Sequence, residues 1–250
     1  MTLRAVAFGD LATGTWGAAL SPHPELPSVA IVGPEARVVV GAELSGGTSA
    51  GDEWWIAGDG LDLAVSPEAA DDAEGAEGDL DQRVTVRGAL GGEHPREADL
   101  IGCRSARMGA LEPGRSQLLR YVCAWFAAGE GLALVAVRPR RAAGHGDERI
   151  TATLFSGGHP LSVAEPRLST TYADAGQPVR ATLELWLAED EDSDQREEER
   201  QVQYPRRAAG EASGTGTSIE LGPFELRVQP FLWRAEGREG AGIYLLAQAR

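Results

Sequence analysis

Short strand-like runs separated by brief turns are the feature of this chain that most constrains its fold. In residues 178–187, PVRATLELWL, apolar side chains alternate with polar ones, which is the period of a strand with one buried face. Comparable runs recur along the chain, among them RAVAF, SVAIV, GLALVAV and GIYLLAQ, and turns such as GPE, GDG, GEG and GREG separate such runs. Turns this short cannot hold the helix that a parallel crossover needs. The sequence therefore predicts an all-β, antiparallel fold with few helices.

One segment leaves a second interpretation open. In SQLLRYVCAWFAA (116–128), Leu118, Leu119, Val122 and Phe126 also fall at helical spacing, and Gly129 could cap a helix. The enrichment in Tyr, Val, Trp and Phe, and the short turn into GLALVAV, favour a strand instead. We expect a strand here.

A boundary between two halves is predicted near GGEHP (91–95), where several short strands have already passed. We expect an N-terminal β domain over residues 1–92 and a C-terminal β domain over residues 93–250. Each would be large enough to close into a barrel or a sandwich.

The charged residues exclude several classes of function. All 23 basic residues are arginines, so no lysine can form a Schiff base or serve a phosphate-binding loop. The formal net charge is -15, and most of it comes from two acidic stretches, residues 67–81 and 188–200. Such stretches are typical of solvated loops that repel nucleic acid, and Asp190, Asp192 and Asp194 lack the glycine and the final glutamate of a calcium loop. We expect no nucleic-acid partner.

Cysteine and histidine usage gives no sign of a metal or a disulfide framework. The two cysteines lack zinc-site spacing, and each of the four histidines stands alone beside Gly or Pro. No nucleotide fingerprint is present, so no cofactor is expected. The sequence shows neither a signal peptide nor a long apolar run, so we expect a cytoplasmic protein without a membrane span.

The tryptophans raise the possibility of an apolar cavity. Trp125, Trp186 and Trp233 fall in predicted strands, where large rings can fill a barrel core or line a ligand cavity. Ionisable residues lie close by in sequence, and a carboxylate kept dry beside aromatic rings would have a raised pKa suited to proton transfer. Core packing, or an exposed pair of ring and charge on the outer face, would explain the same residues.

The order of motifs in the second part resembles the carotenoid hydratase (hydroxyneurosporene synthase)-like family. The motifs are GCRSARMG (102–109), the Trp-containing strand, EPRLSTTYADAG and FLWRAEGREGAG, and together they cover mainly residues 98–250. Gly102, Arg104 and Gly109 look like the family's G-x-R-x-x-x-x-G segment at the entrance to a second barrel. Members of that family often carry Asp-His within this segment, whereas this chain has Ser105 and Ala106. We therefore transfer no catalytic role to this segment.

The resemblance implies two lipocalin-like halves and an apolar, isoprenoid- or polyketide-like small molecule as partner. The leading hypothesis is a binding protein for such a molecule. The second is a cofactor-free hydratase, isomerase or cyclase in which a carboxylate such as Glu165, Glu184 or Glu236 acts as general acid. The third is a structural protein with a filled core. The candidate catalytic residues are Glu184, Glu236 and Tyr172, and the candidate ligand-binding residues are Trp125, Trp186, Trp233, Arg120 and Arg167.

Overall fold

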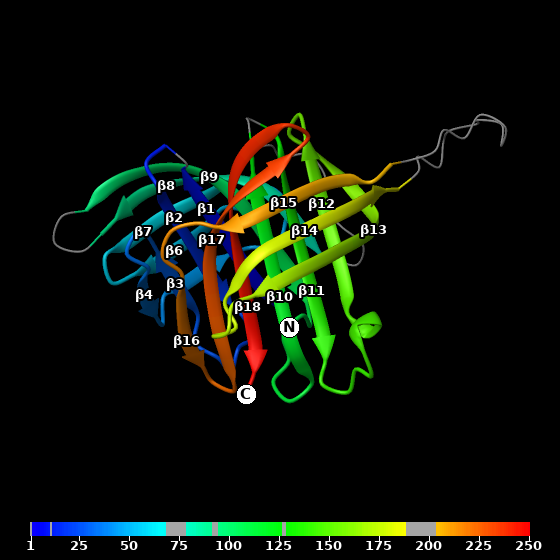
Figure 1. Ribbon diagram of the computed structural model, residues 1–250. Helices are drawn as coiled ribbons and strands as arrows, with labels where there is room; N and C mark the ends of the chain where they lie inside the picture. Colours follow the sequence, from blue (N-terminus) through cyan, green and yellow to red (C-terminus); the bar gives the residue numbers. More distant parts are fainter. Residues whose placement is uncertain (1, 11, 69–78, 92–94, 127–128, 189–203) are drawn as a thin grey trace.

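The protein consists of two antiparallel sheets of nine strands each, which pack against each other (Figure 1). The structure is a computed structural model that describes residues 2–10, 12–68, 79–91, 95–126, 129–188 and 204–250. The two acidic stretches lie largely outside these residues. The predicted all-β, antiparallel fold is confirmed.

The first sheet has the strand order β4-β3-β2-β1-β9-β8-β7-β6-β5 and curls into a half-barrel. Its two edge strands have four residues each, and short edges limit pairing with other chains. The strands are β1 (Thr2–Asp10), β2 (Thr15–Ser21), β3 (Val29–Val32), β4 (Arg37–Val40), β5 (Glu43–Gly46), β6 (Trp54–Gly58), β7 (Leu61–Pro67), β8 (Leu80–Leu90) and β9 (Arg96–Met108).

The second sheet has the order β15-β14-β13-β12-β11-β10-β18-β17-β16, and β15 also pairs with β17. This extra pairing closes eight strands into a barrel, while β16 pairs with the other end of β17. The strands are β10 (Ser116–Trp125), β11 (Gly131–Pro139), β12 (Arg149–Ser156), β13 (His159–Tyr172), β14 (Pro178–Leu187), β15 (Arg206–Ala212), β16 (Thr217–Leu221), β17 (Phe224–Ala235) and β18 (Arg238–Ala249), with a 3-10 turn, η2, at His145–Asp147.

The segment with two interpretations forms a strand. Residues Ser116–Trp125 make β10, which pairs with β11 on one side and β18 on the other. Nine of its ten residues are buried, because one face of β10 looks into the barrel and the other packs on the first sheet. Burial on both faces explains why its apolar residues do not alternate cleanly.

The chain passes from the first sheet to the second between Met108 and Ser116. The predicted boundary at residues 92–93 falls between β8 and β9, and the whole of β8 pairs with β9 in the first sheet. The division between the two sheets therefore lies one long strand later than GGEHP, and the division into two domains stays a prediction.

A continuous apolar layer joins the two halves. It includes Leu3 and Ala7 of β1, Tyr121 and Trp125 of β10, and Ile243 of β18, all almost fully buried. Polar contacts reinforce it: the buried Asp81 carboxylate accepts hydrogen bonds from Ser105 Oγ at 2.5 Å and Thr153 Oγ1 at 2.7 Å, and it pairs with Arg107. Asp81 thus connects β8 and β9 of the half-barrel to β12 of the barrel.

The middle of the barrel is filled by its own aromatic side chains. The ring of Phe231 lies 5.7 Å from that of Trp233 and 5.5 Å from that of Tyr244. Glycines on the two strands paired with β17 leave room for these rings, since a Cβ at Gly210 would lie 2.8 Å from Trp233 and one at Gly242 would lie 2.7 Å from Trp233 Nε1. Open space is therefore left at the ends of the barrel.

Candidate functional site

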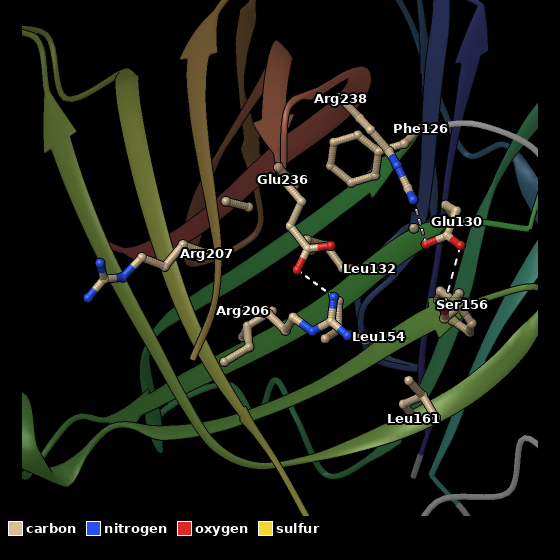
Figure 2. A pocket seen from close by; sticks show the side chains of 15 residues that line it. Phe126, Glu130, Leu132, Leu154, Ser156, Leu161, Arg206, Arg207, Glu236 and Arg238 are labelled. Atoms are coloured by element: carbon tan, nitrogen blue, oxygen red, sulfur yellow. Dashed lines mark hydrogen bonds and ion pairs between the residues drawn. The ribbon is translucent and has the colours of Figure 1, made fainter. Parts of the chain in front are cut away.

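One end of the closed barrel carries a pocket with an apolar floor and a charged rim, which we call the mouth pocket (Figure 2). It encloses about 60 Å³, and about 570 Å³ when the part open to solvent is included. The side chains of its floor are Phe126, Leu132, Leu154, Leu161 and Leu185, and those of its rim are Glu130, Ser156, Arg206, Arg207, Glu236 and Arg238.

The floor follows from strand alternation. On β14 the buried residues Ala181, Leu183 and Leu185 all point into the barrel, and Leu185 is the one nearest the mouth pocket. Leu132 begins the inward face of β11, and the partly buried Leu154 lies opposite it on β12. The mouth pocket is thus the open end of the barrel's core.

The rim is built at strand ends. In an antiparallel barrel every second turn lies at the same end, so the β10–β11 and β17–β18 connections both reach this mouth. The first brings Glu130 and the second brings Glu236, while Arg206 opens β15 and Arg238 opens β18. Charges far apart in sequence are therefore gathered around one opening.

Two ion pairs join neighbouring strand ends at the rim. Arg206 Nη1 lies 2.5 Å from Glu236 Oε1, and Arg238 Nη1 lies 3.2 Å from Glu130 Oε2 (Figure 2). The side chains of Arg206 and Glu236 are 53% and 44% exposed. An ion pair with that exposure contributes at most about 1 kcal/mol, because water screens both charges. The Arg206–Glu236 pair is therefore easily opened.

Glu236 sits in an unfavourable turn position for its residue type. Glu236 and Gly237 form the two-residue turn between β17 and β18, with φ angles of 50° and 77°. Such a turn favours Asn-Gly or Gly-Gly, because a side chain with a left-handed backbone conformation costs roughly 1 kcal/mol. Turn geometry thus does not explain a glutamate here, whereas its contact with Arg206 does.

Glu130 is held much more firmly than Glu236. Its carboxylate accepts hydrogen bonds from Ser156 Oγ and from the backbone N–H of Gly157, each at 3.3 Å. Its backbone carbonyl accepts one at 2.5 Å from Arg83 Nη1 of the first sheet. Burial lowers the pKa of Arg83, but its hydrogen-bonded contact with Glu68 outweighs burial and the net shift is upward. Arg83 therefore stays charged and fixes one side of the rim.

A second polar cluster lies inside the barrel, away from the mouth pocket. Arg120 makes a two-pronged ion pair with Glu148, and both side chains are less than a tenth exposed. Arg120 also donates to Thr170 Oγ1 at 3.4 Å, and this hydroxyl lies 2.8 Å from the Tyr244 hydroxyl. Burial raises the pKa of Tyr244. Burial lowers the pKa of Arg120, but Tyr244 and Glu148 outweigh it, so its net shift is upward.

The structure separates the residues that the sequence had suggested for one site. Only Glu236 among them lines the mouth pocket. Arg120 belongs to the inner cluster, where Tyr172 also acts on its pKa. The rings of the other two buried candidates pack in cores, Trp125 between the sheets and Trp233 inside the barrel.

The remaining predicted residues lie together on the outer face of the barrel. The guanidinium of Arg167 stacks 4.6 Å from the ring of Trp186, and Glu184 accepts contacts from Arg207 at 3.1 Å and from Arg167 at 4.0 Å. This is the exposed pair of ring and charge that the sequence left open as an alternative. Arg167 and Glu184 also border a separate open hollow on this face.

Residues 102–108 of the segment GCRSARMG lie in β9 of the first sheet, and Gly109 follows in the connection that leads to the second sheet. Arg104 is fully buried there, 4.9 Å from the ring of Trp54, and donates to Gln82 Oε1 and Ala50 O, each at 2.9 Å. Burial lowers the pKa of Arg104 to about 10. The charge of Asp52 offsets part of this effect, and the hydrogen-bond acceptors of Arg104 all belong to the half-barrel, so Arg104 serves the core of the half-barrel.

In the described ranges, no group of three or more His, Cys, Asp or Glu side chains is placed to hold a metal ion. Within the same ranges, no helix has both the length and the apolar character needed to cross a membrane.

Comparison with known proteins supports the fold. No family model and no curated protein matches the chain. One similar solved structure is a Nitrosomonas europaea protein that carries the provisional name AttH; the match covers 100% of this chain and 93% of that chain, with a TM-score of 0.56 and 11% identity. At this identity the likeness shows the fold alone. The chain is therefore an all-β protein of two lipocalin-like halves, one a closed barrel and the other a half-barrel.

Proposed function

We propose that this protein binds a small apolar molecule in the mouth pocket. The observation that carries the proposal is the leucine and phenylalanine floor, half enclosed at the end of a closed barrel and surrounded by charged side chains. Lipocalin-like barrels offer such mouths to ligands, and binding pockets are usually apolar with a few polar groups at their rim. The resemblance to the carotenoid hydratase-like family also favours an apolar ligand.

The filled barrel limits the size of the ligand. Phe231, Trp233 and Tyr244 occupy the middle, so the inserted group can only be as deep as the mouth pocket. A six-carbon chain would gain roughly 5 kcal/mol by leaving water, at about 0.8 kcal/mol for each methylene. We therefore propose a short alkyl or prenyl group, or one end of a longer molecule.

An acid–base reaction finds less support. A general acid at neutral pH needs a carboxylate that is kept away from water. The side chains of Glu165, Glu184 and Glu236 are 58%, 37% and 44% exposed, and each carboxylate contacts an arginine. None of these three carboxylates is kept away from water, so binding is the function that we propose.

A neutral solvatochromic dye tests the proposal. We expect it to bind the purified protein with a blue shift, and we expect Leu161→Glu to weaken binding about tenfold, because a charge would enter the apolar floor. Leu161 is 37% exposed, so the substitution leaves the fold intact. Leu232→Glu is the matched control, since Leu232 is 49% exposed and lies outside the mouth pocket. Equal binding by all three proteins, or no binding at all, would reject the proposal in favour of a structural role.

A further inference from the structure

We propose that the ligand carries a carboxylate head group, that Arg206 binds this carboxylate, and that Glu236 occupies its place when no ligand is present. The inference rests on the proposed function, because the apolar part of the same molecule would lie on the floor of the mouth pocket. The contact between Arg206 Nη1 and Glu236 Oε1 at 2.5 Å already shows a carboxylate at this guanidinium.

Position favours Arg206 as the ligand's partner. Figure 2 shows Arg206 and Glu236 meeting over the middle of the mouth pocket near Leu132 and Leu154, whereas Arg207 points away from it. A guanidinium has five N–H donors, so a ligand carboxylate can approach Arg206 before Glu236 leaves. An alkyl chain attached to that carboxylate would reach the leucines directly.

Glu236 is also the carboxylate that can be displaced. It is held in a two-residue turn at a φ of 50°, half exposed, by its pair with Arg206. Glu130, in the neighbouring β10–β11 connection, is fixed by Ser156, Gly157 and the Arg83 contact to its carbonyl. An incoming ligand carboxylate therefore replaces Glu236 at the Arg206 guanidinium, and the Glu236 carboxylate then becomes solvated.

The ion pairs of the rim select among head groups. Arg206 is paired with Glu236 and Arg238 with Glu130, whereas Arg207 pairs with Glu184 on the outer face. A ligand ammonium would have to take Glu236 and leave Arg206 without its carboxylate, which costs the charge-assisted contact. A ligand alcohol could replace neither partner of the pair. A carboxylate preserves the pairing of Arg206, so we expect carboxylate, alcohol and amine to bind in that order of affinity.

The experiment compares hexanoate, hexanol and hexylamine as competitors of the neutral dye at pH 7.5 and low salt. We expect hexanoate to bind the wild-type protein about tenfold more tightly than hexanol. Arg206→Gln should abolish this preference by weakening hexanoate alone. Glu236→Asn should strengthen hexanoate severalfold and leave hexanol unchanged, because it removes the competing carboxylate and suits the turn.

Two controls match these changes in charge. Arg180→Gln removes an exposed guanidinium that pairs with Glu211 outside the mouth pocket, and Glu239→Gln alters an exposed carboxylate paired with Arg234. Both should leave the preference for hexanoate as in the wild type. A loss of preference in Arg180→Gln equal to that in Arg206→Gln would mean a general field effect and overturn the inference.

The outcomes separate this inference from the proposed function. If hexanol and hexanoate displace the dye equally well, and Arg206→Gln changes neither, the carboxylate head group is wrong while the apolar site stands. If neither compound displaces the dye and Leu161→Glu has no effect on it, the proposed function fails and the inference fails with it.

Discussion

The Arg120–Glu148 pair is the most deeply buried charge pair inside the barrel, with side chains that are 8% and 6% exposed. Removing one partner of such a pair leaves the other charge buried without compensation. For Glu148→Gln we expect the free energy of unfolding in urea to fall by about 3 kcal/mol. The exposed Arg180–Glu211 pair provides the control, because Glu211→Gln should change that free energy by less than about 1 kcal/mol. Equal losses of unfolding free energy in the two variants would contradict the burial of the Arg120–Glu148 pair.

Single residues also show which features of the site the sequence could not predict. Alternation on β14 correctly places Leu183 inside the barrel, and it places Glu184 and Trp186 on the opposite face. The predicted site nevertheless includes both outward residues, because Glu184 is close to Trp186 in sequence, and nearness in sequence does not require that two side chains face a cavity. Glu236 does reach the mouth pocket, but its partner Arg206 is thirty positions away in the chain and on another strand. No local pattern predicts that contact.

At the scale of strands, barrel closure depends on two glycines that face Trp233. β15 pairs with β17 through Gly210, which lies opposite Trp233, and Gly242 of β18 leaves space for the same indole. For Gly210→Ala we expect a loss of about 2 kcal/mol in stability, because the new methyl group would overlap the rings of Phe231 and Trp233. The near-ultraviolet circular dichroism of the aromatic rings should change as well.

Gly144→Ala is the control for this substitution. A Cβ at Gly144 would meet nothing within 4 Å, so both stability and the aromatic spectrum should stay as in the wild type. An unchanged spectrum in Gly210→Ala would mean that the rings do not pack against β15 as described.

Strands and their pairing could be predicted much better than the site. The period of two and the short turns require neighbouring antiparallel strands, and even β10 was assigned correctly from its residue types. Which strand ends share one mouth depends on the number of strands and on the β15–β17 closure, which joins residues separated by two intervening connections. Long-range pairing of this kind produces no periodic pattern in the sequence. The sequence therefore could not predict that Glu130, Arg206 and Arg238 lie around one opening.

At the scale of the whole molecule, the apolar layer and Asp81 connect the half-barrel to the barrel. Since this layer continues through both sheets, we expect a single cooperative thermal transition. For Asp81→Ala we expect the free energy of unfolding to fall by about 3 kcal/mol, because Arg107 would remain buried without its closest carboxylate. Thr153→Val should cost only about 1 kcal/mol, since it removes one hydrogen bond. Two separate transitions in the wild type would show that the halves unfold independently.

The hydrogen bond from Arg83 to the carbonyl of Glu130 connects the mouth pocket to the first sheet. Arg83 of the first sheet holds Glu130 at the rim of the barrel, so a ligand that contacts Glu130 would also affect the contact between the two halves. Ligand binding and the stability of the contact between the halves are thereby coupled. A bound ligand would slow amide hydrogen exchange along β8, and a substitution that weakens the contact between the halves would lower the affinity for the ligand.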